Sequence, residues 1–341
     1  MKRFALLLLA LLLSLTLSAQ QTDWYEKTKI GFVGFGDYYY VAESHDEEIE
    51  GENGLWFRRI YLTFDHKFDD KLSARLRFEA NHPGDFESSG ELEPFIKDAW
   101  VKYRVSDGHA VVAGIQPTPA FSAIEDFWGY RSLEKTPNDL FRINSSRDFG
   151  IAAQGAINDS GSLQYHAMFG NGSGVANEIN QDKYFGAAVS FAPSDAIFVQ
   201  VYADNDSRPG DADRSTLQGF AGFSGDRWRG GIHYLTQQRN RPAGDHDVSL
   251  ASLFGIYELS ETMTLIGRLD HSFDPIPDVS RIAYVPVAPG ADVNFLLVGL
   301  DVQLHPNAGI IPNIEYLSYD GAPGANPDDD ILPRLTFYLK F

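Results

Sequence analysis

The sequence contains no cysteine, and its 28 basic residues are outnumbered by 47 acidic ones, which gives a formal net charge of −19 at pH 7. The absence of cysteine excludes a disulfide framework, thiol chemistry and any zinc site built on cysteine ligands. The acidic balance argues against nucleic acid as a partner, because proteins that bind a phosphate backbone carry clustered basic residues. A membrane protein remains compatible with this charge if the acidic residues lie in exposed loops.

Long hydrophobic runs are lacking beyond the N-terminus. The chain starts with Lys2 and Arg3, continues with an apolar run over residues 4–17 and reaches small residues at Ser18 and Ala19. This pattern predicts a secretory signal peptide over residues 1–19, since the apolar run is shorter than the roughly 20 residues that span a bilayer. No linker rich in Pro, Gly or Ser divides the rest, so we expect residues 20–341 to form one exported domain. Without a transmembrane helix, such a domain crosses a membrane only as a closed barrel.

The last eleven residues, Ile331–Phe341, alternate strictly between apolar and polar side chains. A period of two places the two sets on opposite faces of a β-strand. The apolar set is Leu335, Phe337, Leu339 and Phe341, and the polar set is Arg334, Thr336, Tyr338 and Lys340. In an outer-membrane barrel the apolar face meets lipid and the polar face meets the lumen, and the last strand pairs with the first. An ordinary C-terminal edge strand is the alternative.

Similar alternation recurs along the chain and predicts sixteen strands. The segments are about Ile30–Val41, Trp56–Phe68, Leu72–Asn81, Phe95–Arg104, His109–Gln116, Arg147–Ile157, Ser162–Gly170, Lys183–Phe191, Ala196–Asp204, Ser215–Phe223, Arg227–Gln237, Val248–Leu259, Met263–Phe273, Val293–Leu304, Gly309–Tyr319 and Ile331–Phe341. Short turns alternate with longer polar connections, as they do when short periplasmic turns form one rim of a barrel and longer external loops the other. We therefore predict an all-β fold, a transmembrane antiparallel β-barrel in the bacterial outer membrane.

Several short motifs resemble a known family. They are Trp56–Leu62 (WFRRIYL), the Phe68-Asp69-Asp70 turn, Arg75–Glu79 (RLRFE), Ile96–Val101 (IKDAWV), Ala113–Pro117 (AGIQP) and Pro119-Ala120-Phe121. Together they resemble the phosphate-selective porins O and P over about Trp56 to Arg131. The resemblance implies a sixteen-stranded channel, usually a homotrimer, with a basic, anion-preferring lumen.

The longest connection, Pro117–Ser146, is the third loop of the predicted barrel, and loops of this length are usually functional. In porins the loop at this position folds into the lumen, so we expect it to narrow the channel; an external loop with one or two helical turns is the alternative. The candidate constriction residues are Phe121, Glu125, Asp126, Arg131, Lys135 and Arg142. The basic members stand beside acidic ones, so phosphate specificity does not carry over from the resemblance.

Strand parity places more basic than acidic residues on the lumen side. The candidate pore-lining residues are Arg59, Arg75, Arg77, Lys102, Arg104, Arg147, Arg229, Arg268 and Arg334. A water-filled pore lined by such residues favours anions. The alternative is that these arginines pair with Asp65, Glu79 and Asp98 and brace the wall.

Together these features predict an outer-membrane porin for passive diffusion of small hydrophilic, preferentially anionic, solutes. We expect no enzymatic activity, no cofactor and no metal, with outer-membrane lipid and lipopolysaccharide as surroundings; the acidic loops are solvated or bind divalent cations. A channel selective for sugars or aromatic solutes is an alternative, based on Trp100, Tyr184, Tyr202 and Tyr338. A barrel hydrolase using His166 or His233 is a more distant one.

Overall fold

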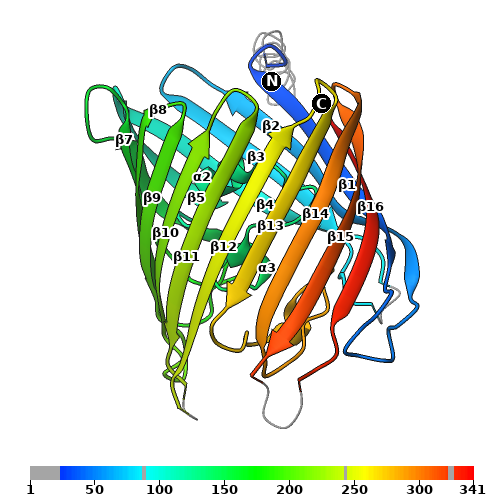
Figure 1. Ribbon diagram of the computed structural model, residues 1–341. Coiled ribbons are helices and arrows are strands. Elements are labelled where there is room, and N and C mark those ends of the chain that lie inside the picture. The colour runs from blue at the N-terminus through cyan, green and yellow to red at the C-terminus, as the bar shows by residue number, and fades with distance from the viewer. Residues whose placement is uncertain (1–23, 87–89, 242–243, 322–325) are drawn as a thin grey trace, which may run out of the picture.

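The computed structural model describes residues 24–86, 90–241, 244–321 and 326–341, and these form a closed barrel of sixteen antiparallel strands (Figure 1). Each strand pairs with its neighbours in the chain, and β16 pairs with β1. The strands are β1 (Thr28–Tyr40), β2 (Asn53–Lys67), β3 (Leu72–Asn81), β4 (Glu93–Ser106), β5 (His109–Pro117), β6 (Arg147–Ala156), β7 (Leu163–Gly170), β8 (Tyr184–Ser194), β9 (Ile197–Asp206), β10 (Arg214–Ser224), β11 (Trp228–Arg239), β12 (His246–Glu258), β13 (Met263–Ser272), β14 (Asp292–His305), β15 (Ala308–Asp320) and β16 (Asp330–Lys340). The predicted fold is confirmed, and the predicted signal peptide lies outside the described residues.

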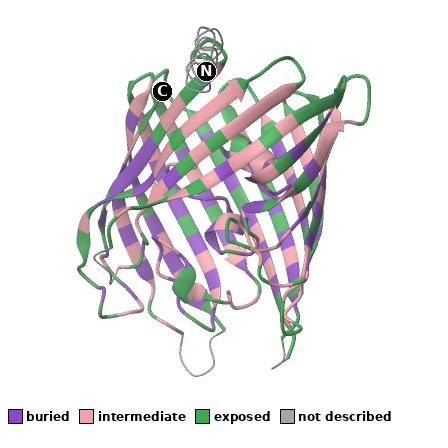
Figure 2. Ribbon diagram, turned by 180° about the vertical axis from the view of Figure 1, so that it is seen from behind, coloured by how far each residue is buried: buried purple, intermediate pink, exposed green. Residues whose placement is uncertain are grey.

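The strands present one apolar face outward. In β12, for example, Leu253 and Tyr257 are about half exposed, whereas Leu250 and Phe254 on the other face are buried. The same alternation forms bands of buried and exposed residues around the wall (Figure 2). Because successive side chains of a strand point to opposite faces, this pattern separates a lipid-facing surface from an interior.

The barrel closes between the first and last strands, as the C-terminal alternation predicts. The backbone N–H of Phe32 donates to the carbonyl of Phe341 at 3.0 Å, and the N–H of Phe341 donates back to the carbonyl of Phe32 at 3.0 Å. Their rings stack with centroids 5.3 Å apart. Phe341 thus extends the seam by one residue pair and leaves no open sheet edge there.

Two bulges change which side chains face inward. Between β1 and β2 the register shifts at Phe35 and Gly36, so that Arg58 is the extra residue and is buried beside Arg59. Between β3 and β4 it shifts at Arg77 and Phe78, which leaves Lys97 as the extra residue. A bulge places two consecutive residues opposite one residue of the partner strand, so strict alternation fails there. Arg58 and Lys97, which strict alternation would place on the outer face, therefore point inward.

Long connections gather at the end of the barrel opposite the two termini (Figure 1). The β5–β6 loop (residues 118–146) contains α2 (Ser122–Trp128) and α3 (Pro137–Leu140), and the β13–β14 loop (residues 273–291) contains the short 3-10 helix η1 (Val279–Arg281). No helix in the described part of the chain is long and apolar enough to cross a membrane.

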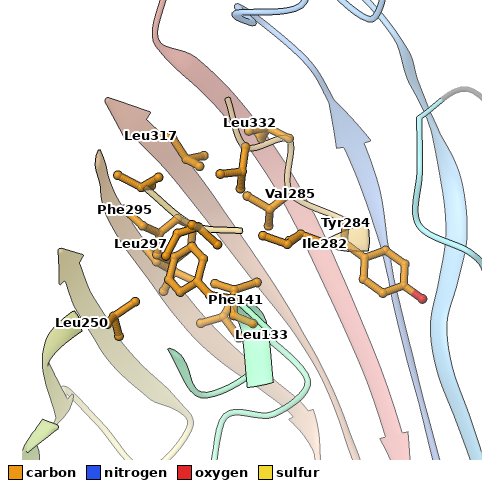
Figure 3. Close-up of a cluster of buried hydrophobic side chains, with 14 of the residues drawn as sticks. Leu133, Phe141, Leu250, Ile282, Tyr284, Val285, Phe295, Leu297, Leu317 and Leu332 are labelled. Atoms are coloured by element: carbon orange, nitrogen blue, oxygen red, sulfur yellow. The ribbon is translucent and has the colours of Figure 1, made fainter. Parts of the chain in front are cut away.

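These two loops share one apolar core with the inner face of the wall. From the loops it includes Leu133, Phe141, Ile282 and Val285, and from the wall it includes Leu250, Phe295, Leu297, Leu317 and Leu332 (Figure 3). Leu133, Leu250, Phe295, Leu297, Leu317 and Leu332 have no measurable exposure. Burial of each large apolar side chain contributes roughly 1.5–3 kcal/mol. The interior beside β11–β16 is therefore dry near the loops, and the contribution of the β13–β14 loop was not predicted from the sequence.

Deleting Phe341 tests the seam. We expect a markedly smaller folded fraction, because the deletion removes both backbone hydrogen bonds to Phe32 and the ring stack. Heat-modifiable migration in SDS gels measures that fraction. Phe341→Tyr and Phe273→Ala, the latter on the lipid face away from the seam, should fold as the wild type does. A deletion variant that folds with wild-type yield would contradict this role.

Candidate channel lumen

The β5–β6 loop is fastened to the inner wall by hydrogen bonds from side chains of distant strands. Arg58 on β2 donates to the carbonyl of Leu133 at 2.7 Å, and Arg229 on β11 donates to that of Trp128 at 3.0 Å. Further side-chain donors are Gln218 to Ala120, Gln237 to Ile143 and Arg268 to Lys135, each to a backbone carbonyl. Since the donors come from β2, β10, β11 and β13, the loop is hydrogen-bonded to strands far from its own neighbours β5 and β6 in the barrel order.

Aromatic packing fixes α2 against the wall. The Phe127 ring lies 5.8 Å from Phe198 and 5.4 Å from Phe220, measured between centroids. Trp128 packs edge-on against Phe254 at 4.9 Å and is 1% exposed. Gly222 allows the close approach, since a Cβ there would lie 2.4 Å from the Phe127 ring. These contacts hold the start of the loop close to β9–β12.

The β13–β14 loop places Tyr284 between the β5–β6 loop and β2. Its hydroxyl lies 2.7 Å from the carbonyl oxygens of Arg58 and His82, and it accepts a hydrogen bond from Arg59 at 3.0 Å. Guanidinium carbons of Arg58 and Arg59 lie 4.8 and 5.4 Å from its ring centre, and Lys135 Nζ lies 5.7 Å from it. Cations over an aromatic face are stabilised by the ring quadrupole. Tyr284 therefore links both loops to the wall.

A buried charge network completes this junction. Arg58 pairs with Glu134 of the β5–β6 loop and lies 3.6 Å from Asp37 on β1. Arg334 on β16 lies 3.2 Å from Asp37 and 3.0 Å from Glu315, and it also donates to the carbonyl of Tyr284. Buried charges persist only when they are paired and hydrogen-bonded. Arg334, a candidate pore-lining residue, points inward and is buried in this network.

The arginines of the β2–β3 hairpin are paired. The ion pairs join Arg59 to Glu79 at 2.9 Å, Arg75 to Asp65 at 2.7 Å and Arg77 to Asp98 at 3.2 Å. Two inward cations from neighbouring strands share the same acids, with Arg147 at 2.5 Å from Asp98 and Lys97 at 3.1 Å from Glu79. In this hairpin the arginines are therefore paired with acidic residues, which is the alternative that the sequence raised to a lining of free cations. Arg268 is likewise paired, with Asp270 on its own strand.

The predicted constriction residues have different surroundings. Arg131 lies 3.5 Å from Glu125 and 3.1 Å from Asp139, and its side chain is 23% exposed. Phe121 and Lys135 are buried, Asp126 is exposed, and exposed Arg142 donates to the carbonyl of Arg281. Arg131, Glu125 and Asp126 border open space, whereas Phe121 packs with Ala188 and Tyr202.

Three of the cavities in the described structure have volumes of about 630, 620 and 380 Å³. Arg77, Arg131, Arg147, Arg229 and Lys340 line the first, and Lys102 and Arg104 line the second and third. The part of the chain that the structure describes offers no ion-pair partner to Lys102, Arg104 or Arg229. No group of three His, Cys, Asp or Glu side chains able to hold a metal occurs among the described residues.

Sequence reasoning missed four residues that organise this interior: Arg58, Lys97, Asp37 and Tyr284. The two basic residues were hidden by bulges, which leave no clear signal in the alternation. Tyr284 lies in a connection of nineteen residues, 273–291, and that length alone could have marked it as a functional loop. Asp37 stands in a strand among tyrosines, where an inward carboxylate implies a buried cation as its partner.

Comparisons with known proteins agree with this geometry. The family model of the phosphate-selective porins O and P matches residues 33–126, which confirms the resemblance over that part. No curated protein matches the chain. Among solved structures, the anion-selective porin from Comamonas acidovorans is similar with a TM-score of 0.69 and 12% identity, over 92% of this chain and 100% of that one.

Two further structures share the fold. Salmonella typhi OmpF, in complex with daunomycin, gives a TM-score of 0.66 with 9% identity, over 92% of this chain and 97% of that one. The trimer form of OmpT, an outer-membrane protein of Vibrio cholerae, gives 0.62 with 9% identity, over 92% and 99%. The closed sixteen-stranded barrel is the fold of these porins, and the family match over residues 33–126 supports an outer-membrane channel.

Replacing Glu134 by Gln tests the buried network. The variant leaves the Arg58 guanidinium buried without its loop partner, and breaking a buried pair in this way costs about 3–5 kcal/mol. Guanidinium-induced unfolding in lipid vesicles, followed by tryptophan fluorescence, measures the loss. Glu261→Gln, in an exposed short turn, is the matched control and should be near neutral. Equal stability of the two variants would contradict the role of the pair.

The buried Lys135 should make the stability of the folded barrel depend on pH. Burial, reinforced by the Arg59 guanidinium, lowers the pKa of Lys135 from its ordinary 10.5 to about 7. Between these values the unfolded chain binds more protons than the folded one, so this penalty on folding is full below pH 7 and diminishes as pH rises. The free energy of unfolding should therefore rise with pH relative to Lys135→Met, by up to about 1.4 kcal/mol per pH unit. Parallel curves for both proteins from pH 6 to 9 would refute this.

Proposed function

We propose that the channel is water-filled and admits small hydrophilic solutes by passive diffusion, with a preference for anions. The observation that carries the proposal is the charge around the three cavities, where basic residues outnumber acidic ones by eleven to seven in a chain of net charge −19. The basic residues are Lys27, Lys29, Lys67, Lys71, Arg77, Lys102, Arg104, Arg131, Arg147, Arg229 and Lys340, and the acidic ones are Asp65, Asp69, Asp70, Asp107, Glu125, Asp126 and Asp301.

Unpaired cations near open water matter most for selectivity. Lys102 and Arg104 lie on the same inward face of β4, and both border the second and third cavities. A narrow aqueous path with low-dielectric walls focuses the potential of such charges and raises the local concentration of anions. The paired arginines of β2 and β3 add less, because Asp65, Glu79 and Asp98 offset them. We infer that the β4 pair sets the sign of the selectivity.

The β5–β6 loop acts in this proposal as the constriction. Its attachment to β2, β10, β11 and β13 supports that role, since the hydrogen bonds hold it across the interior. Arg131 and Glu125 border the largest of the three cavities and form the polar edge of the loop. Three basic residues of the loop were predicted to line the constriction. Arg131 is ion-paired, Lys135 is buried, and Arg142 donates a hydrogen bond to the β13–β14 loop. This arrangement supports general anion preference over phosphate specificity.

The alternative functions receive less support. Tyr184 and Tyr202 are buried and lie 3.0 Å apart between hydroxyl oxygens, so neither ring offers a platform for a sugar or an aromatic solute. Trp100 is covered by the Arg75 guanidinium at 5.4 Å. His233 is buried, and neither of its ring nitrogens has a hydrogen-bond partner among the described residues, so no serine is aligned with it.

The assembly and its surroundings are part of the proposal. The trimer form of the OmpT structure supports a homotrimer, which light scattering of the detergent-solubilised protein tests. The exposed apolar outer face supports contact with membrane lipid, and we extend that expectation to lipopolysaccharide. Export with cleavage after Ala19 would leave a mature N-terminus at Gln20, which mass spectrometry of the purified protein identifies.

The selectivity proposal is tested by reversal potentials in planar bilayers under a KCl gradient. The wild type should favour chloride, and Lys102→Glu with Arg104→Glu should reduce or invert that preference, because the change replaces two unpaired cations by two anions. Lys102→Arg with Arg104→Lys keeps the charge and should keep the preference. Cation preference in the wild type, or an unchanged reversal potential in the double Glu variant, would overturn the proposal.

A further inference from the structure

We propose that the end of the barrel opposite the termini holds a binding site for a small hydroxylated oxyanion, such as a sugar phosphate or a sugar acid. The inference rests on the proposed channel function, because it describes a docking step at one entrance of that channel. Four arginines gather there: Arg208 in the β9–β10 loop, Arg214 and Arg239 at the ends of β10 and β11, and Arg241 in the β11–β12 loop. Arg214 and Arg239 are direct partners in the strand register.

One carboxylate is shared by three of these guanidinium groups. Asp278 of the β13–β14 loop lies 3.5 Å from Arg239, 3.9 Å from Arg214 and 3.9 Å from Arg241. These distances are longer than the 2.7–3.2 Å of the ion pairs in the β2–β3 hairpin. Asp278 therefore lies among three cations without a short ion pair to any of them. Asp278 also has a φ of 58°, in the left-handed region that non-glycine residues rarely adopt. The loop thus holds a tethered carboxylate where a free oxyanion would bind.

The guanidinium groups retain unused donors. Arg239 is 2% exposed, and its Nη2 has no hydrogen-bond partner among the described residues. Arg208 pairs with Asp206 at 2.6 Å, and Asp213 accepts from the Arg208 backbone rather than from a guanidinium. The four cations lie close enough to repel one another, and Asp278 is the acid that Arg214, Arg239 and Arg241 share. Arginine forks bind carboxylate and phosphate oxygens in pairs, so the cluster suits a second oxyanion.

A polar cavity of about 600 Å³ adjoins the cluster and shares Arg208 and Arg214 with it. None of the described residues lining it is acidic, and most others are small or carry amide or hydroxyl groups, including Asn171, Asn177 and Ser207. The side-chain amides of Asn171 and Asn177 make no hydrogen bond within the described part of the chain. Amides both donate and accept, as sugar hydroxyls require. The anionic group therefore binds the arginines, and the hydroxylated remainder faces the amides.

Isothermal titration of the full-length protein folded in detergent tests the site with three probes: glucose 6-phosphate, inorganic phosphate and glucose. Glucose 6-phosphate should bind, phosphate should bind at least about fivefold more weakly, and glucose should not bind. Loss of one charge-assisted hydrogen bond in Arg241→Gln should weaken glucose 6-phosphate about tenfold. Arg281→Gln removes the same charge from an exposed residue next to the site and should retain wild-type affinity.

The tethered carboxylate gives the sharpest result. Asp278→Asn removes the competing anion and should tighten glucose 6-phosphate binding by about fivefold or more, whereas a purely structural ion pair would leave affinity unchanged or lower it. No binding to the wild type, equal affinities for phosphate and glucose 6-phosphate, or an unchanged or weaker affinity in Asp278→Asn would overturn the site.

The bilayer experiment separates this inference from the proposed function. If the channel prefers anions but does not bind glucose 6-phosphate, the binding site is refuted and the proposed function stands. If glucose 6-phosphate binds with the expected ranking of variants but the channel shows no anion preference, the site is supported and the proposed selectivity is refuted. Heat-modifiable migration of every variant shows that each barrel is folded before binding is measured.

Discussion

Asp37 lies on β1 between two arginines, Arg58 on β2 and Arg334 on β16, and both arginines reach past it to other acids. Glu134 of the β5–β6 loop forms an ion pair with Arg58, and Glu315 of β15 forms one with Arg334. None of these side chains is more than 2% exposed. A buried charge without its partner costs several kcal/mol, so the loop has to lie against this part of the wall for the cations to remain there. The position of the loop follows from that constraint.

The rest of the interior follows from this junction. Once Glu134 and Tyr284 are held beside β2, the apolar residues of both loops cover the inner faces of β11–β16, and the space beside them is dry. Open space remains beside β2–β9, and toward the rim that carries the short turns it also reaches β1, β11, β14 and β16. Among the described residues, Lys102 and Arg104 have no acidic ion-pair partner there. The barrel is therefore asymmetric inside. One side supports the loops, and the other carries the charges that solutes meet.

The sequence predicted the wall well and the interior poorly, for a physical reason. The sixteen strands and their turns follow from local rules, because alternation and turn residues act over a few positions and all described strands fall within a few residues of the predicted segments. The same parity predicts that Arg75, Lys102 and Arg334 face the lumen. It does not predict the inward orientation of Arg58 and Lys97, because the position of a bulge depends on both strands of a pair. The sequence raised the pairing of arginines with Asp98 as an alternative that strand parity could not decide. That pairing and the packing of Tyr284 between loops depend on contacts between distant segments, which no local pattern encodes.

The account's central claim is this division of the interior into a dry side and a wet side. Because the chain has no cysteine, single cysteines report it directly through the rate of modification by a water-soluble methanethiosulfonate in the folded barrel. Lys102→Cys on the open side should react rapidly and reduce the current, whereas Leu297→Cys beneath the loops should react only after unfolding. Comparable reaction rates at the two positions in the folded protein would contradict the account.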